Sequence, residues 1–329
     1  MKIAIVTLNY NGSKETLELL KSLKEQTDKD FEIIVVDNAS EEADFINLQN
    51  SLIHIPTSFR FYRESSTKSG QVGYPQVQIV RNSENLGFSG GNNVGIRQTF
   101  KNSSDWVILL NNDTWVENGF MERLKAILSV KNGIIGIPLV ENSIVAYCGK
   151  VQWLKPTLKH VYSIKNQVLR KNKNSIPNTK YLILNTYLYA IGGAIAIHKD
   201  VFGKIGLLDE NYFLYFEDAD FSVRAAKAGF NISIAKNLTA NHHVSSSTKK
   251  LGSPLLLRYH YRNALYFNLK NGPWNIKLLV WPWSWIIAIK QLGKIAIKQD
   301  IEKSKAILAG VLDFYKNKMN KIKASTKAS

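Results

Sequence analysis

The sequence has 329 residues, of which 45% are hydrophobic, so it can form one large domain or a domain with a smaller appendage. Its single cysteine, Cys148, excludes an internal disulfide framework and any metal site built from several cysteines, and it fits a reducing compartment. The formal net charge of +17 makes nucleic acid, an anionic membrane surface and an acidic substrate candidate partners. Because the chain carries no helix-turn-helix, zinc-finger or RNA-binding signature, we expect no nucleic-acid partner.

The first two apolar runs predict neighbouring strands of one sheet. Residues 2–8 form too short a run for an export signal and predict a strand, which ends in the polar loop 9–12. A helix should follow, with Ser13 as its cap, and residues 31–36 predict the next strand, which ends at Asp37. This order favours a parallel sheet with both polar strand ends side by side at one edge. There, Asp37 can accept hydrogen bonds from a base or a ribose; a cap or turn role is the alternative.

Residues from about 41 to 76 lack a clean period and contain prolines, glycines and a serine-rich patch. This stretch is long for an ordinary connection, so we expect an insertion loop or a flap. The sheet should resume at residues 77–80. Residues 81–93 then hold three glycines and four asparagines just before an expected helix, in a pattern that matches neither common nucleotide fingerprint. Such a turn lets backbone N–H groups approach a diphosphate or a sugar; a glycine-rich turn without a ligand is the alternative.

An uninterrupted apolar run, Trp106–Leu110, predicts a buried strand that ends abruptly in Asn111, Asn112 and Asp113. In open α/β sheets, ligands bind at the carboxyl ends of the strands. An aspartate with amide neighbours at such a point can hold a hard divalent cation through oxygen ligands, and the cation can hold phosphates. A turn without a metal is the alternative, since Asn and Asp favour turns.

The middle of the chain is less regular. A helix is expected over residues 119–130 and an apolar run over 134–140, whereas residues 150–185 are basic and lose the pattern. We interpret this basic stretch as a solvated face, with a lobe that faces an anionic acceptor as the alternative.

Three acids stand among aromatic residues further along the chain. Residues 191–197 are small and apolar, which suits close approach by a ligand or another backbone segment. Glu217, Asp218 and Asp220 then precede a helix that Gly229 should end. A carboxylate held in a partly apolar cleft has a raised pKa and can serve as a general base. The alternative is that these acids only decorate a helix N-terminus, where the helix dipole favours them.

Two adjacent histidines, His242 and His243, follow a short expected strand. A histidine there can supply a nitrogen ligand to a divalent metal held by Asp113. Because neighbouring side chains on an extended strand point in opposite directions, we expect at most one of the two to be a ligand.

The C-terminal region combines tryptophans with lysines. Four tryptophans lie between Trp274 and Trp285, and the apolar run 278–289 is too short and too broken by Pro282 to span a bilayer. Tryptophan mixed with lysine suits the headgroup interface, so we expect contact with an anionic membrane surface. Helices that cap the domain, with their lysines in water, are the alternative.

Taken together, six blocks in order resemble the inverting family 2 glycosyltransferases of GT-A fold. More narrowly, they resemble the rhamnosyltransferase-like branch of bacterial cell-surface polysaccharide synthesis. The blocks are Thr7–Gly12, Val35–Ser40, Asn85–Asn93, Leu110–Asp113, Gly206–Glu210 with Phe216–Asp220, and His242 with Val244, Ser245 and Ser247. The resemblance covers roughly residues 2 to 265.

The resemblance implies an α/β fold with a Rossmann-like, mainly parallel central sheet flanked by helices. Residues 1–265 would form the glycosyltransferase domain, with a nucleotide-binding half over about 1–115 and an acceptor half over about 116–265. Residues 266–329 would form a helical, basic, tryptophan-rich extension that associates with the membrane.

The resemblance also implies roles for individual residues. Asp113 and His242 would bind Mg²⁺ or Mn²⁺ on the donor diphosphate, Asp218 would be the catalytic base, and Glu217, Asp220 and Gly193 would support the base or contact the acceptor. Asn111 replaces the first acid of the family's metal motif, which implies weaker metal affinity. The expected donor-nucleotide contacts are Thr7, Asn9, Tyr10, Asp37, Asn38, Asn85, Gly87, Gly90, Asn92, Asn111 and Asn112.

The expected function is inverting transfer of a sugar from a nucleotide-diphosphate sugar, dTDP-rhamnose or a UDP-sugar, to a hydroxyl of a lipid-linked glycan. The protein would act as a peripheral enzyme, and as a candidate homo-oligomer, at the cytoplasmic face of the cell membrane. One alternative is a sugar nucleotidyltransferase, but the loop 9–12 lacks the basic phosphate-binding residues that it would need. Another is a non-catalytic nucleotide-sugar-binding module, which would have no use for Asp218.

Overall fold

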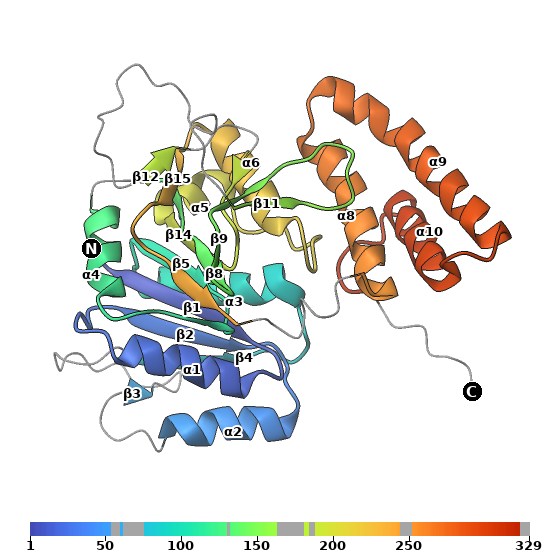
Figure 1. Cartoon of the computed structure of the whole chain (residues 1–329). Coiled ribbons are helices and arrows are strands. Elements are labelled where there is room, and N and C mark those ends of the chain that lie inside the picture. The colour runs from blue at the N-terminus through green and yellow to red at the C-terminus, as the bar shows by residue number, and fades with distance from the viewer. Residues whose placement is uncertain are drawn as a thin grey trace.

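The computed structural model describes residues 1–53, 60–61, 76–129, 132–162, 181–183, 188–243 and 252–322. Within these ranges a nine-stranded sheet forms the centre of the molecule (Figure 1). Its strands, in spatial order, are β12 (Tyr181–Ile183), β15 (Ile232–Ala235), β7 (Ile134–Gly136), β14 (Ala194–His198), β5 (Trp106–Leu110), β1 (Ile3–Asn9), β2 (Glu32–Asp37), β4 (Gln76–Arg81) and β3 (Arg60–Phe61). The pairs from β5 through β1, β2 and β4 to β3 are parallel, whereas β14 and β12 pair antiparallel with their neighbours. The predicted mainly parallel sheet is therefore confirmed.

Helices cover both faces of this sheet, which is why its central strands are continuous apolar runs. Ile3 and Ile5 of β1 pack with one set of helices, and Val6 packs with the other, as the alternation of side chains along a strand requires. The first face carries α1 (Ser13–Lys24), α2 (Glu42–Ile53) and α4 (Phe120–Leu128). The second face carries α3 (Gly87–Lys101), α5 (Lys199–Ile205) and α6 (Glu217–Lys227).

Two small sheets lie beside the central sheet. One contains β11 (Lys159–Val161), β10 (Cys148–Lys150) and β13 (Leu188–Tyr189). The other contains β6 (Thr114–Trp115), β16 (Ala240–His242), β8 (Leu139–Glu141) and β9 (Ile144–Ala146). In the second sheet, Thr114 pairs with His242, so the end of the Trp106 strand and the histidine pair meet although they are far apart in sequence.

Two expectations for the first half of the chain were wrong. The stretch from residue 41 begins with helix α2 rather than an insertion loop. The helix forms because its Leu48 and Leu52 side chains are buried in the hydrophobic core on the α1 face of the sheet. Residues 54–59 and 62–75 lie outside the described ranges. Ser13 does not cap α1 with its side chain; it is the first helical residue, and its N–H donates to Asp44 Oδ1 at 3.0 Å.

The C-terminal region is helical, as expected, and stands to one side of the sheet (Figure 1). It contains α8 (Pro254–Asn271), α9 (Trp274–Ala296) and α10 (Ile301–Tyr315). These helices pack around Leu265, Val280 and Ile307, and α8 also contacts α6. The expected domain boundary at residue 265 falls inside α8. None of the helices in the described ranges combines the length and the apolarity needed to cross a bilayer.

Candidate active site

The ends of β1 and β2 form the first part of the candidate site. Asn9 is in register with Asp37, and its Nδ2 donates to Asp37 Oδ1 at 2.9 Å, so the two strand ends lie side by side as predicted. Asn9 Nδ2 also donates to Ser40 and Asp44, and its Oδ1 accepts from Thr16. Every polar atom of the buried Asn9 side chain is used in this way, so Asn9 holds the buried Asp37 carboxylate in place.

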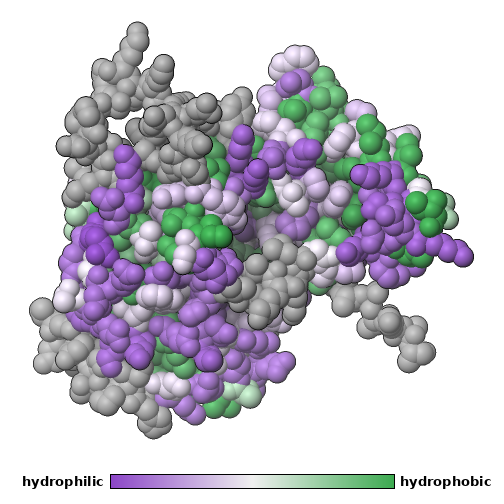
Figure 2. Space-filling view, in the orientation of Figure 1, coloured by the Kyte–Doolittle hydropathy of each residue, from purple (hydrophilic) through white to green (hydrophobic). Residues whose placement is uncertain are grey.

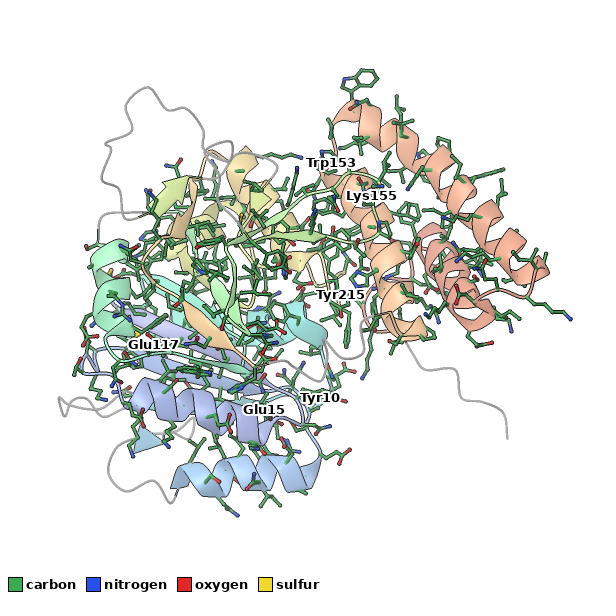
Figure 3. All side chains as sticks on the ribbon, in the orientation of Figure 1. Tyr10, Glu15, Glu117, Trp153, Lys155 and Tyr215 are labelled. Carbon is green, nitrogen blue, oxygen red and sulfur yellow. The ribbon has the colours of Figure 1, made fainter. Side chains whose placement is uncertain are left out.

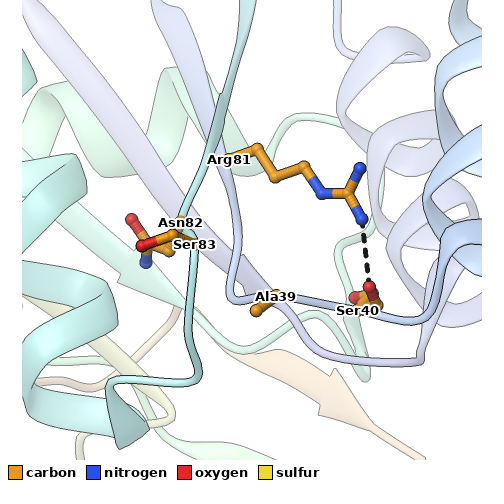
Figure 4. A pocket seen from close by; sticks show the side chains of 5 residues that line it. All are labelled: Ala39, Ser40, Arg81, Asn82 and Ser83. Carbon is orange, nitrogen blue, oxygen red and sulfur yellow. Dashed lines mark hydrogen bonds between the residues drawn. The ribbon is translucent and has the colours of Figure 1, made fainter.

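An open cavity of about 480 Å³ lies at the ends of β2 and β4 (Figure 4). Ala39, Ser40, Arg81, Asn82 and Ser83 line it. Arg81 is in register with Asp37; its Nε lies 3.3 Å from Asp37 Oδ2 and its Nη2 donates to the Ser40 carbonyl at 3.2 Å. The sequence interpretation missed Arg81, although its place at the end of the third parallel strand was the signal that could have identified it.

The glycine-rich segment lies against this strand edge and opens α3, as its pattern predicted. Asn38 binds it through both ends of its amide: Oδ1 accepts from the Leu86 N–H at 3.0 Å, and Nδ2 donates to Asn85 Oδ1 at 3.0 Å. Gly87 has φ +73°, and a Cβ there would lie 2.3 Å from the Phe213 carbonyl oxygen. Gly87 is therefore required by the chain itself, whether or not a ligand also approaches.

The remaining expected donor contacts differ in accessibility. Thr7 is buried, and its hydroxyl has no partner among the described residues. Gly90 is buried inside α3, and the buried Asn92 donates to the Phe88 carbonyl of its own helix. Tyr10 is exposed and labelled at the end of β1 in Figure 3.

The end of β5 brings Asp113 to His242. Asp113 Oδ1 lies 3.3 Å from His242 Nε2, and His242 Nδ1 lies 3.6 Å from Glu141 Oε2. Burial works against protonation of His242, but attraction to Asp113 and then to Glu141 outweighs it and raises the pKa of the imidazole above its usual value. His243 turns elsewhere, with its Nε2 3.4 Å from Glu18 Oε2, so the two rings face different carboxylates as expected.

Asp113 and His242 fit a divalent cation as a partial ligand set. Asp113 Oδ1 is buried and has no hydrogen-bond partner among the described residues, and an imidazole nitrogen faces it. The described part of the chain holds no cluster of three or more histidine, cysteine or acidic side chains with metal-binding geometry, so a diphosphate or water would have to complete the shell. Asn112 points toward the β1 loop, where its Nδ2 donates to Thr16 Oγ1 at 3.1 Å.

Asp218 is the second residue of α6 and is half-buried. Its Oδ2 accepts from the Gly192 N–H at 3.0 Å, and its Oδ1 accepts from the Ala219 N–H at 2.7 Å. Burial raises the pKa of this carboxyl group to about 6, against the opposing effect of these N–H groups. A carboxylate with such a pKa can take a proton from an alcohol near neutral pH.

Residues Gly192 and Gly193 connect Asp218 to the end of β5. The Gly193 carbonyl accepts from the Asn111 N–H at 2.9 Å, while the preceding Gly192 binds Asp218. A Cβ on Gly193 would lie 3.0 Å from Leu139 and 3.3 Å from the Asn111 amide, so the small residue permits this close approach.

The two neighbouring acids differ from Asp218 in their surroundings. Glu217 is buried, its Oε2 has no partner among the described residues, and burial followed by repulsion from Asp218 raises its pKa well above the usual value. Asp220 is fully buried, and its charge is matched by Arg224 at 2.7 Å and Lys270 at 2.8 Å. Asp220 therefore supports the packing of α6 on α8, whereas Glu217 lies beside the candidate base.

Helix α8 holds the segment that leads into Asp218. Tyr215 and Phe216 have φ of +70° and +76°, a strained conformation for residues of this size. Asn263 Nδ2 donates to the carbonyls of Leu214 at 2.8 Å and Tyr215 at 3.1 Å, and the Tyr215 ring stacks on His260 with centroids 4.1 Å apart. Tyr215 is labelled beside α8 in Figure 3. The sequence interpretation missed this contribution; an asparagine and a histidine inside an aromatic helix were its only signal.

Comparisons with known proteins agree with this geometry. The family model described as Glycosyl transferase family 2 matches residues 4–206. The dTDP-rhamnosyl transferase RfbF of Shigella flexneri is 22% identical over 279 residues, which cover 82% of this chain and 80% of that protein. The N-acetylglucosaminyl-diphospho-decaprenol L-rhamnosyltransferase of Mycobacterium tuberculosis is 19% identical over 317 residues, which cover 92% of this chain and 95% of that protein.

Among solved structures, GalNAc-T7 with UDP, GalNAc and Mn²⁺ has a similar fold, with a TM-score of 0.60 and 15% identity. The match covers 83% of this chain and 49% of that one, so the chain spans about half the length of this neighbour. At this identity the match supports a common fold alone.

Proposed function

The chain belongs to glycosyl transferase family 2 and has the GT-A fold, and from this premise we propose the finer reaction. It transfers a sugar, with inversion, from a nucleotide-diphosphate sugar to a hydroxyl of a lipid-linked glycan. The donor is dTDP-rhamnose or a UDP-sugar. Family membership supports a sugar transferase over the alternatives of a nucleotidyltransferase and a passive binding module.

The donor proposal is supported by the polar strand ends and by the names of the relatives. Arg81 lines a cavity of about 480 Å³ at the ends of β2 and β4, where its guanidinium can donate hydrogen bonds to a base or a ribose. The buried Asp37 carboxylate, 3.3 Å from Arg81 Nε, holds this guanidinium at the cavity wall. The Shigella relative is named for dTDP-rhamnosyl transfer, and the GalNAc-T7 structure contains UDP. These names support the two donor classes without choosing between them.

The observation that carries the mechanism is the hydrogen bond from the Gly192 N–H to Asp218 Oδ2, next to the pairing of Gly193 with Asn111. It links a carboxylate of raised pKa to the strand end that leads to Asp113. In the proposed step, an Asp218 oxygen takes the hydroxyl proton as the acceptor oxygen bonds to the anomeric carbon. The bond from that carbon to the diphosphate breaks, and the nucleoside diphosphate leaves with the electron pair. One displacement of this kind inverts the anomeric configuration.

A divalent cation, Mg²⁺ or Mn²⁺, would be held by Asp113 and His242. When bound, it would offset the negative charge that the leaving diphosphate gains. Glu141 would keep the His242 ring oriented, because it touches the nitrogen that faces away from Asp113.

The acceptor proposal rests on the Mycobacterium relative, whose name specifies a diphospho-decaprenol substrate. A lipid-linked acceptor would place the reaction at a membrane surface, and we propose the inner face of the cell membrane.

A thermal-shift panel of dTDP-rhamnose and several UDP-sugars, with and without Mn²⁺, tests the donor. We expect one donor class to raise the melting temperature in a Mn²⁺-dependent way. NMR of the product with a short-chain lipid diphosphate sugar should then show the opposite anomeric configuration to the donor. Retained configuration, or no stabilisation by any nucleotide sugar, would contradict the proposal.

A further inference from the structure

Helix α9 has a buried face and, on its other side, apolar residues that stay largely exposed. Val280, Ser284, Ile287 and Gln291 are its buried residues, and they face α8 and α10. Their spacing of three or four residues places them on one side of the helix. This inner face attaches α9 to the rest of the protein, together with Trp281 and Trp285, which contact Tyr315 of α10. These contacts do not account for the large exposed fraction of the apolar residues on the other side of α9.

The outer face carries an exposed apolar stripe, which we call the α9 ridge. At about 100° per residue, its members fall within an arc of about 80°, centred about 130° from the buried face. Trp274 is 76% exposed, Trp285 is 67% exposed and Ile289 is 66% exposed. The α9 ridge consists of Trp274, Leu278, Trp281, Trp285, Ile289 and Leu292. Figure 2 shows hydrophobic residues at the surface over α9.

The charged residues of α9 all carry the same sign. Helix α9 contains no acidic residue, and the chain has none between Asp220 and Asp300. Lys277, Lys290 and Lys298 lie on or just after α9, are exposed, and form no ion pair with the described residues. Residues 254–329 as a whole contain 14 lysines and arginines and three acidic residues. The surface around the ridge therefore attracts anions.

The exposed tryptophans and the surrounding lysines together indicate what binds the α9 ridge. Exposed tryptophans flanked by lysines match the headgroup region of an anionic bilayer, where the rings bury their carbon atoms and the lysines meet phosphate. A second copy of the chain fits less well, because two α9 ridges packed together would bring lysines together without acidic partners on either helix. A spanning orientation is excluded for α9 by its composition.

We propose that α9 lies flat in the headgroup region of an anionic membrane, with the α9 ridge turned into the lipid. The biological reason for this membrane contact rests on the proposed function, because a lipid-linked acceptor would lie in the membrane that α9 binds. Helix α8 connects this surface to the catalytic segment, because it packs on α9 and also binds the Leu214 and Tyr215 carbonyls.

The test is co-sedimentation of the full chain with vesicles of phosphatidylcholine, alone or with 30% phosphatidylglycerol. We expect binding to the anionic vesicles that weakens about tenfold or more at high salt. The variant Trp274→Ser/Trp285→Ser/Ile289→Ser should bind on the order of 100-fold more weakly. The matched control Ile46→Ser/Ile144→Ser/Tyr162→Ser removes three exposed apolar side chains elsewhere and should bind like the wild type. Melting curves confirm that each variant is folded.

Equal vesicle binding by the wild type and the α9 ridge variant would overturn the inference. So would a wild-type dimer that does not bind vesicles and that the ridge variant converts to a monomer, because a second copy would then cover the ridge. Transfer to a water-soluble acceptor separates the two proposals. The ridge variant should keep this activity. A wild type that binds vesicles but transfers no sugar would contradict the proposed function and leave the membrane inference standing.

Discussion

The Gly192 N–H donates to Asp218 Oδ2 at 3.0 Å, so the candidate base is held by the backbone of the loop that enters β14. The next residue, Gly193, accepts from Asn111 at the end of β5. Two consecutive glycines thus connect the acidic start of α6 with the strand end that carries Asp113. The candidate base and the candidate metal ligand Asp113 are thus joined through backbone contacts, whereas the cavity at the ends of β2 and β4 is lined by other residues.

Replacing the base tests its role most simply. Asp218→Asn keeps the shape of the side chain but removes the proton acceptor, so kcat should fall by about 10²–10⁴-fold. The donor Kd should stay within about twofold, because the nucleotide is proposed to bind at β1, β2 and β4. Asp200→Asn, at an exposed acid on α5, is the matched control and should be fully active. A near-normal rate in Asp218→Asn would exclude it as the base.

The pH dependence follows from the same carboxyl group. Burial raises the pKa of Asp218 to about 6, and only the ionised form can accept a proton. We therefore expect kcat/KM to be level above about pH 7 and to fall about tenfold per pH unit below about pH 6. The profile should be measured at two Mn²⁺ concentrations, because protons also compete for His242. An acid limb that moves with Mn²⁺ would assign the titration to the metal site instead.

Substitution of Asn263 tests whether α8 positions residues 214–216, the segment that precedes Asp218. Asn263→Ala leaves the Leu214 and Tyr215 carbonyls without their donor, which should cost about 1–3 kcal/mol of unfolding free energy. We expect kcat to fall about tenfold while the donor KM is unchanged, because the segment leads to Asp218 and not to the cavity at the ends of β2 and β4. Asn275→Ala, at an exposed asparagine on α9, is the control. A rise in donor KM with constant kcat would argue against a positioning role.

The proposed cation site makes a graded prediction. EDTA should abolish transfer, and Mn²⁺ should restore it. Asp113→Asn should weaken Mn²⁺ binding, measured by electron paramagnetic resonance, by more than about tenfold, and Glu141→Gln should weaken it by roughly 10–100-fold through His242. Glu18→Gln is the matched control, because Glu18 faces His243 instead. Unchanged Mn²⁺ affinity in Asp113→Asn would remove that residue from the site.

Much of the sheet could be predicted because its central strands contain apolar runs that end at polar residues. The neighbouring positions of Asn9 and Asp37 followed from a parallel pairing with no offset, and the structure confirms them. The different directions of His242 and His243 followed from strand geometry alone. In both cases a local backbone rule fixes where the side chain points.

The features that sequence reasoning missed depend on distant partners. Helix α2 buries Leu48 and Leu52 at helical spacing, but the polar residues between them obscured that period. Arg81 becomes part of the cavity wall only because β4 lies next to β2. Asn263 meets the Tyr215 carbonyl across 48 residues of sequence, and a polar residue inside an aromatic helix does not indicate which distant group it binds.

We propose above all that Asp113 and Asp218 face the same cleft. A crystal structure of the protein with Mn²⁺ and either UDP or dTDP would be the most direct test of this. We predict an anomalous Mn²⁺ peak in contact with Asp113 and the diphosphate, with the terminal phosphate directed toward the Asp218 carboxylate across Gly192 and Gly193. A nucleotide whose phosphates point away from Asp113, or protein atoms filling the space between its terminal phosphate and Asp218, would contradict the account.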